Sequence, residues 1–266
     1  DAGLSLEKEG LLSKAMYRSR NPALSDSTFD KSAYSDAPWW DDQDSNMMTM
    51  EGTAEKTGIL LILIATSAIA TAMFMPASTP LAILGFIAGF ILALVIIFTG
   101  STNPVLISMY AVFEGMVLGG ITWLYEQYFP GIGILAVVLT LGILGVMLTI
   151  YRAGLIEWNK NLQIAVYSSM LAIIVIYMVS IIGIFMGFNV PYIHEASPIG
   201  IAFSLFVVGI ASLCLVADFD FIERGVERGA PKQLEWRAAF GLMVTLIWLY
   251  LEILELIAKL AITSRR

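Results

Sequence analysis

The sequence has little of the residues that carry most metal and redox chemistry. It contains one cysteine, Cys214, and one histidine, His194. A single cysteine excludes a disulfide framework and any CxxC redox or zinc site within this chain. Because Cys214 lies in an apolar run, we expect it to be a small packed side chain. His194 stands beside Glu195 with no second histidine, so we expect a surface residue and not a metal ligand.

Charged residues are also scarce. Only 14% of the residues are Asp, Glu, Lys or Arg, and 58% are hydrophobic, whereas soluble domains have about 25% charged and about 45–50% apolar residues. No HExxH, GxSxG or phosphate-binding glycine motif is present. The few basic residues do not form a nucleic-acid surface. We therefore expect an integral membrane protein that is not an enzyme, has no cofactor and has no nucleic-acid partner.

Long apolar runs fill the chain after residue 56. There are seven, and each meets the length of about 20 residues that a helix needs to cross a bilayer. None shows the alternation of a membrane strand, so helices are the structure that satisfies their backbone groups in lipid. The sequence predicts an all-α bundle of seven transmembrane helices over about Thr57–Pro76, Pro80–Thr99, Pro104–Tyr125, Gly131–Tyr151, Leu162–Gly187, Ile199–Phe221 and Gly241–Ile262.

The first 56 residues are polar, and we expect a largely disordered tail before a transmembrane domain at residues 57–266. Two apolar pairs near its end, Trp39-Trp40 and Met47-Met48, allow two interpretations: they dock at the membrane interface, or they belong to a solvated linker. Placing the amino terminus in the cytoplasm leaves 12 Lys and Arg inside and 3 outside. The positive-inside rule therefore predicts a cytoplasmic amino terminus and an outer carboxyl terminus.

Pairs of glycines four residues apart occur in two of the predicted helices. They are Gly85 with Gly89 and Gly183 with Gly187. Such pairs let helix backbones approach closely. Because glycine is common in membrane helices, we expect these pairs to mark packing within one chain rather than a dimer interface.

Three acids lie within or at the edge of the apolar runs: Glu114, Asp218 and Glu252. An ionisable group at the bilayer centre costs on the order of 2.5–3.5 kcal/mol on insertion scales, so each is a candidate functional residue. Two carboxyls placed close together titrate as a unit, which suits a proton-operated gate. They also offer the hard oxygen ligands that Ca²⁺ takes.

Structural roles for the same acids remain open at this point. Glu114 could join helices by a hydrogen bond, and Asp218 could be a solvated residue at a helix end. Glu252 has an acid at i+3 and no basic residue within one turn. The i, i+4 pairs are expected to be structural ion pairs: Asp220 with Arg224, and Glu255 with Lys259.

The connection before the seventh run is mixed in character. Pro231 suits the first turn of a helix, and Trp236 with Arg237 suits the membrane interface. We expect a short surface helix over Pro231–Phe240 and a seventh span that begins near Gly241. This arrangement would bring Asp218 and Glu252 closer together.

Several motifs together resemble the Bax inhibitor-1/YccA family, the transmembrane Bax inhibitor motif superfamily. They are, in chain order, Arg18-Ser-Arg-Asn-Pro22, Phe113-Glu-Gly-Met-Val-Leu-Gly119, Asp218-Phe-Asp-Phe-Ile-Glu-Arg-Gly225 and Trp248-Leu-Tyr-Leu-Glu-Ile-Leu254. The resemblance covers the seven spans and part of the tail, and the Arg18–Pro22 motif resembles the start of bacterial members with a longer tail. It implies a seven-helix bundle with an inner hairpin.

The resemblance also implies a function. Some members of the family pass Ca²⁺ down its gradient in a pH-dependent way, with two acids of helices six and seven as sensor and latch; by position these are Asp218 and Glu252. Here the second acid is Glu instead of Asp, the turn between the acids is longer, and Pro80–Thr99 has no basic latch residue. We expect a pH-sensitive Ca²⁺ leak channel in a bacterial cytoplasmic membrane, with Glu114 as a secondary acid. The alternative is a regulator that binds another membrane protein such as a protease, as one bacterial member does.

Overall fold

Seven helices make up the part of the chain that the computed structural model describes, residues 46–187, 193 and 195–265. All seven are long and apolar enough to cross a membrane, so the predicted all-α, seven-span architecture is confirmed. The predictions for His194 and for residues 1–45, including Trp39-Trp40, lie outside the described residues. The helices are α2 (Met50–Met73), α3 (Thr79–Thr99), α4 (Pro104–Glu126), α5 (Ile132–Arg152), α6 (Lys160–Met186), α7 (Pro198–Glu227) and α8 (Leu234–Ser264).

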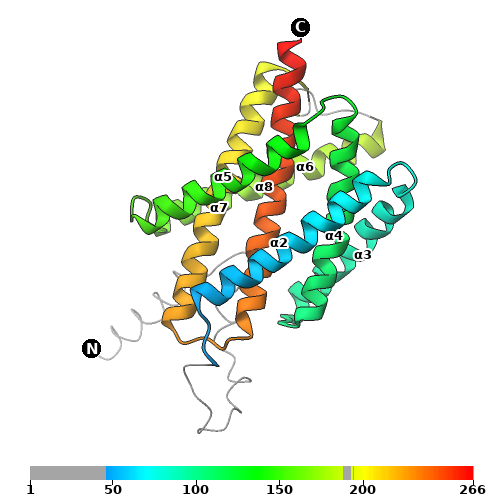
Figure 1. The fold of residues 1–266 in the computed structure, drawn as a ribbon. Helices are drawn as coiled ribbons and strands as arrows, with labels where there is room; N and C mark the ends of the chain where they lie inside the picture. The colour runs from blue at the N-terminus through cyan, green and yellow to red at the C-terminus, as the bar shows by residue number, and fades with distance from the viewer. Residues whose placement is uncertain (1–45, 188–192, 194, 266) are drawn as a thin grey trace.

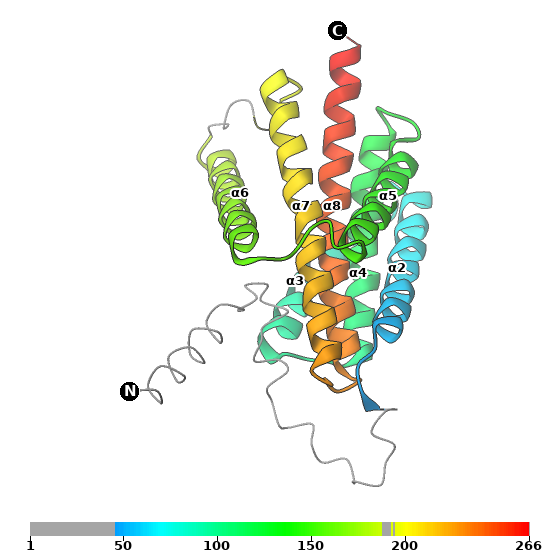
Figure 2. The same ribbon diagram turned by 90° about the vertical axis from the view of Figure 1, so that its left-hand side faces the viewer.

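The last helix, α8, runs through the middle of the bundle with α7 antiparallel to it (Figures 1 and 2). Of the most apolar 18-residue window of α8, 67% is buried inside the protein, against 17% for α3 and for α6. The edge contact between Tyr110 of α4 and Phe240 of α8, with ring centroids 5.1 Å apart, is part of this packing. The inner hairpin that the family resemblance implies is therefore formed by α7 and α8.

Glycines of α4 decide how closely it approaches α2. A Cβ atom added to Gly115 would lie 2.5 Å from the carbonyl oxygen of Ile64, and one added to Gly119 would lie 2.2 Å from that of Ala68. No side chain fits at either position, because the obstacle is backbone. The two glycines thus allow α2 and α4 to cross in backbone contact.

Of the two predicted glycine pairs, one packs as expected. A Cβ on Gly85 of α3 would lie 2.8 Å from the carbonyl oxygen of Phe113 on α4, and Gly89, one turn later, is buried against the same helix. Packing within the chain is confirmed there. Gly187 instead follows the end of α6 with φ 82°, and a Cβ there would meet nothing within 4 Å. The second pair therefore does not form a contact surface.

The predicted surface helix over Pro231–Phe240 is wrong. Helix α8 begins at Leu234 and continues without interruption through Gly241 to Ser264. Leu234 and Phe240 are 1% and 0% exposed, so the first turns of α8 are held in the bundle by burial rather than lying flat on the surface. With 30 and 31 residues, α7 and α8 are each about 45 Å long, longer than the ~30 Å hydrocarbon layer.

The chain just before α2 pairs with the turn between α7 and α8. The Met48 amide donates to the Ala230 carbonyl at 2.6 Å, and the Lys232 amide donates to the Asn46 carbonyl at 2.7 Å. Met48 is only 1% exposed, so its side chain packs inside the protein and does not belong to a solvated linker. Helix α2 itself begins at Met50, seven residues before the predicted first span.

Candidate functional site

Glu252 lies in the middle of α8 and faces α6. The Tyr177 hydroxyl of α6 donates to its two carboxylate oxygens at 2.8 and 3.0 Å, and the indole nitrogen of Trp248 donates to Oε1 at 3.0 Å. The residue is 5% exposed. The carboxylate is thus buried and held in place by hydrogen bonds. Both of the side chains that donate these bonds, Tyr177 and Trp248, are neutral.

Asp218, on α7, is 4% exposed and lies one helical turn beyond Cys214. The depth of Asp218 along the hairpin axis, relative to Glu252, follows from the register of the two helices. Lys259 of α8 donates hydrogen bonds to Gly200 and Ser204 near the start of α7 and so lies level with them. In an antiparallel pair with this register, the two acids are offset by about nine residues, roughly 13 Å along the axis. The structure thus brings both acids to the same hairpin but at different depths, too far apart to share one proton.

Glu114 lies at a different place in the bundle. A Cβ on Gly89 of α3 would lie 3.3 Å from its Oε2 atom, so the side chain points into the interface between α3 and α4. Tyr110 lies one turn earlier on α4, on the same side. Glu114 therefore faces α3, whereas Glu252 faces α6.

A row of polar side chains continues from Glu252 along α8. Trp248, Glu252, Glu255 and Lys259 are spaced by four, three and four residues, which places them on one face of the helix. With Tyr177 of α6 and Ser204 of α7 they form what we call the polar seam. The predicted ion pair between Glu255 and Lys259 is confirmed at 2.8 Å.

The second predicted ion pair, Asp220 with Arg224, is also present, with Arg224 Nη2 and Asp220 Oδ2 2.5 Å apart. It lies toward the end of α7 that adjoins the turn, beside Glu223, whose carboxylate accepts a hydrogen bond from the Tyr151 hydroxyl of α5. These charges cover the end of the hairpin opposite Lys259. They are exposed or half-buried, in contrast to Asp218.

Glu235, in the first turn of α8, is a buried acid that the sequence did not single out. It is 0% exposed, and it accepts hydrogen bonds from the Thr49 amide at 2.9 Å and from the Thr49 hydroxyl at 3.1 Å. Its other carboxylate oxygen pairs with Lys56. A Cβ on Gly52 would lie 2.3 Å from Glu235 Oε1. The one available signal was Thr49, a good helix N-cap ahead of an apolar run, but nothing linked it to Glu235.

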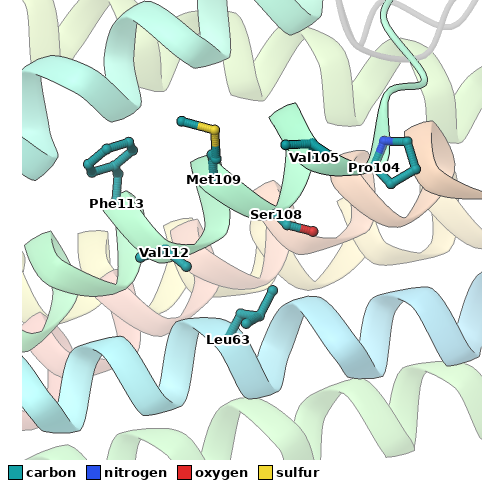
Figure 3. Close-up of a pocket in the computed structure, with 7 residues that line it drawn as sticks. All are labelled: Leu63, Pro104, Val105, Ser108, Met109, Val112 and Phe113. Carbon is teal, nitrogen blue, oxygen red and sulfur yellow. The ribbon is translucent and has the colours of Figure 1, made fainter.

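Two hollows lie among the apolar helix faces. The larger, of about 660 Å³, is lined by α2, α4, α5 and α8, and the hydrogen bond between the Thr122 and Tyr250 hydroxyls, 2.6 Å long, lies at its wall. The smaller, of about 390 Å³, is drawn in Figure 3 and is lined by six residues of α4 and by Leu63 of α2; Ser108 and Val112 lie on the side of α4 toward Leu63, whereas Met109 and Phe113 point away from it. Neither hollow is lined by Asp218 or Glu252.

Comparison with known protein families gives the chain its relatives. The model of the family described as Bax inhibitor 1 like matches residues 19–262. The chain belongs to this family. The match covers all seven helices and confirms the resemblance that the motifs indicate, so this is a multi-pass membrane protein of the Bax inhibitor 1 like family. No curated protein matches the chain.

The described residues of this family member offer no cluster of three or more His, Cys, Asp or Glu side chains that could hold a metal ion. Asp218 and Glu252 lie on the two helices of the inner hairpin, and each offers carboxylate oxygens, the kind of ligand that Ca²⁺ takes.

Proposed function

We propose that the protein is a pH-sensitive cation leak of a bacterial cytoplasmic membrane, with Ca²⁺ as its permeant ion. The observation that carries the proposal is the pair of buried carboxyls on the inner hairpin, Asp218 at 4% and Glu252 at 5% exposure. Family membership supports it. In the topology that the basic residues favour, the amino terminus and the α7–α8 turn lie in the cytoplasm.

The two acids act in series in this proposal. A cation crossing the hairpin would meet Asp218 and Glu252 one after the other, separated by roughly 13 Å. An ionised carboxylate attracts a cation, and protonation removes this attraction, so proton binding at either level changes the flux. Tyr177 and Trp248 hold the Glu252 carboxylate in one position. Glu114, between α3 and α4, would be a secondary acid.

The test is Ca²⁺ flux into liposomes that contain the full chain, measured at several pH values beside Glu252→Gln and Asp218→Asn. We expect flux in the wild type and a flattened pH dependence in each variant, because an amide cannot titrate. The matched control is Glu157→Gln, at an exposed acid of the α5–α6 loop, which should keep the wild-type profile. Absence of flux above empty liposomes at every pH would refute the proposal.

The alternative function, a regulator that binds another membrane protein, is favoured by one observation. The chain enters the bundle by pairing with the turn between α7 and α8, through Met48 and Ala230. A partner held by the preceding tail would thus act next to the hairpin. Deleting residues 1–45 separates the two functions: a leak keeps its flux, whereas a regulator loses its partner.

A further inference from the structure

Lys259 is the most deeply buried basic side chain among the described residues, at 3% exposure. Its ammonium group is surrounded by oxygen atoms: the Ile193 carbonyl at 2.6 Å, the Ser204 hydroxyl at 2.7 Å, the Glu255 carboxylate at 2.8 Å and the Gly200 carbonyl at 3.5 Å. Lysine is almost never buried this far unless it is paired. Carbonyl, hydroxyl and carboxylate oxygens are also the ligands that Ca²⁺ takes in proteins.

The place of this ammonium group matters as much as its partners. Lys259 lies seven residues after Glu252 on the same face of α8, roughly 10 Å along the axis. Near Glu252, the rings of Tyr177 of α6 and Phe203 of α7 pack edge to face, with centroids 6.2 Å apart. A cation that leaves Glu252 toward the carboxyl end of α8 therefore meets a fixed positive charge at the end of the seam.

We propose that Lys259 is a tethered cation that occupies a cation site at the end of the polar seam and closes it. When the ammonium group leaves, the oxygens of Glu255, Ser204 and the two carbonyls can contact a divalent cation in its place. This inference rests on the proposed leak function and deepens it, because it names the group that blocks the path at the end opposite the α7–α8 turn. A lysine that only ties α8 to α7 would leave the flux unchanged when it is removed.

The experiment compares Lys259→Met with Lys259→Arg in liposomes loaded with a calcium indicator. Methionine keeps the length and removes the charge, so we expect Ca²⁺ flux to rise at least several-fold. Arginine keeps the charge, so it should hold the flux at the wild-type level. Lys160→Met, at an exposed position at the start of α6, is the matched control and should change nothing. If the wild type conducts Ca²⁺, a folded Lys259→Met protein with flux at or below that of the wild type overturns the proposal.

Removing Lys259 takes away the ion pair of the Glu255 carboxylate, and the single variant could fail to fold. The double variant Lys259→Met/Glu255→Gln avoids this, because both charges are lost together. The double variant should still raise the flux, since the ammonium group that closes the seam is absent. A monodisperse peak on size-exclusion chromatography checks that it is folded. Flux at the wild-type level in a folded double variant counts against the proposal in the same way.

A binding measurement separates this inference from the leak function itself. Equilibrium dialysis of the purified full chain against radioactive Ca²⁺ should show one more bound ion per chain in Lys259→Met than in the wild type, and none more in the double variant. If no variant shows flux but Lys259→Met binds the extra ion, the leak function fails and the cation site stands. If the wild type shows flux, and Lys259→Met neither increases that flux nor binds an extra Ca²⁺ ion, then the leak function stands and the tethered-cation proposal fails.

Discussion

Glu235 and Lys259 are charged side chains buried at opposite ends of α8, and they are held in different ways. At the first turn, Glu235 is tied to residues that lie before and within α2, Thr49 and Lys56. Near the last turns, Lys259 is held by its own helix, by α7 and by the carbonyl of Ile193 just before α7. The first contact crosses more than 170 positions of sequence, whereas the second joins neighbouring elements.

Because the contacts differ, we expect the two ends of α8 to have different roles. The Glu235 end is where the chain that precedes the bundle is bound, so forces on the tail reach the hairpin there. The Lys259 ammonium group is held by α7, α8 and the residue Ile193 before α7, so in the proposed leak we expect this end to respond to what passes along the seam. Substitutions at the two ends should therefore separate stability from flux.

The largest effect is expected from Glu235→Ala. It leaves the Lys56 ammonium and the Thr49 amide without their buried acceptor, and removing one partner of a buried pair costs about 3–5 kcal/mol. Chemical unfolding of the purified protein should show this loss. Calcium flux per folded protein should not rise, in contrast to Lys259→Met. The exposed acid Glu227 is the control, and Glu227→Ala should stay within about 0.5 kcal/mol; equal effects of the two changes would contradict the prediction.

A smaller loss is expected from Gly52→Ala. The added methyl group would stand 2.3 Å from the Glu235 carboxylate, so either helix α2 or the carboxylate must move, at a cost of about 1–3 kcal/mol. Gly58→Ala on the same helix is the matched control, because a Cβ there meets nothing within 4 Å. It should raise the free energy of unfolding by up to about 1 kcal/mol, the difference in helix propensity. A stabilising Gly52→Ala would show that the Glu235 contact is loose.

The smallest effect is expected from Thr49→Val. The Thr49 hydroxyl accepts the Gly52 amide at 2.9 Å and donates to Glu235 at 3.1 Å, and valine keeps the shape of the side chain without either bond. Loss of a helix N-cap costs about 0.5–2 kcal/mol. Amide hydrogen exchange should show faster exchange at the start of α2 and no change near Lys259. An equal increase in the exchange rate near Lys259 would show that the two ends of α8 are coupled.

Sequence reasoning succeeded where the cause is local. Seven spans follow from the length and hydropathy of continuous runs, and the pair of Glu255 with Lys259 follows from helix geometry alone. It failed where the cause lies far along the chain. Nothing near Pro231 shows that the following turns are buried, and nothing near Met48 shows that it pairs with Ala230.

The candidate site likewise has features that the sequence predicts and features that it does not. The acids of α7 and α8 could be chosen because lipid makes any charge conspicuous. Their relative depth could not, because it depends on where α8 begins, at Leu234 and not at Gly241. The hydrogen bond from Tyr177 to Glu252 joins two helices 75 positions apart, and no pattern in the sequence predicts it.

The length of α8 has a consequence for the membrane around it. Glu235 and Lys259 are 24 positions apart on one unbroken helix, a span of about 36 Å that is somewhat greater than a hydrocarbon layer of ~30 Å. Each buried charge then lies close to one headgroup layer, where water is near enough to replace its partners. A thicker bilayer would draw both polar ends into hydrocarbon and a thinner one would expose them. Bilayer thickness is thus a variable to which both ends of α8 are sensitive at once.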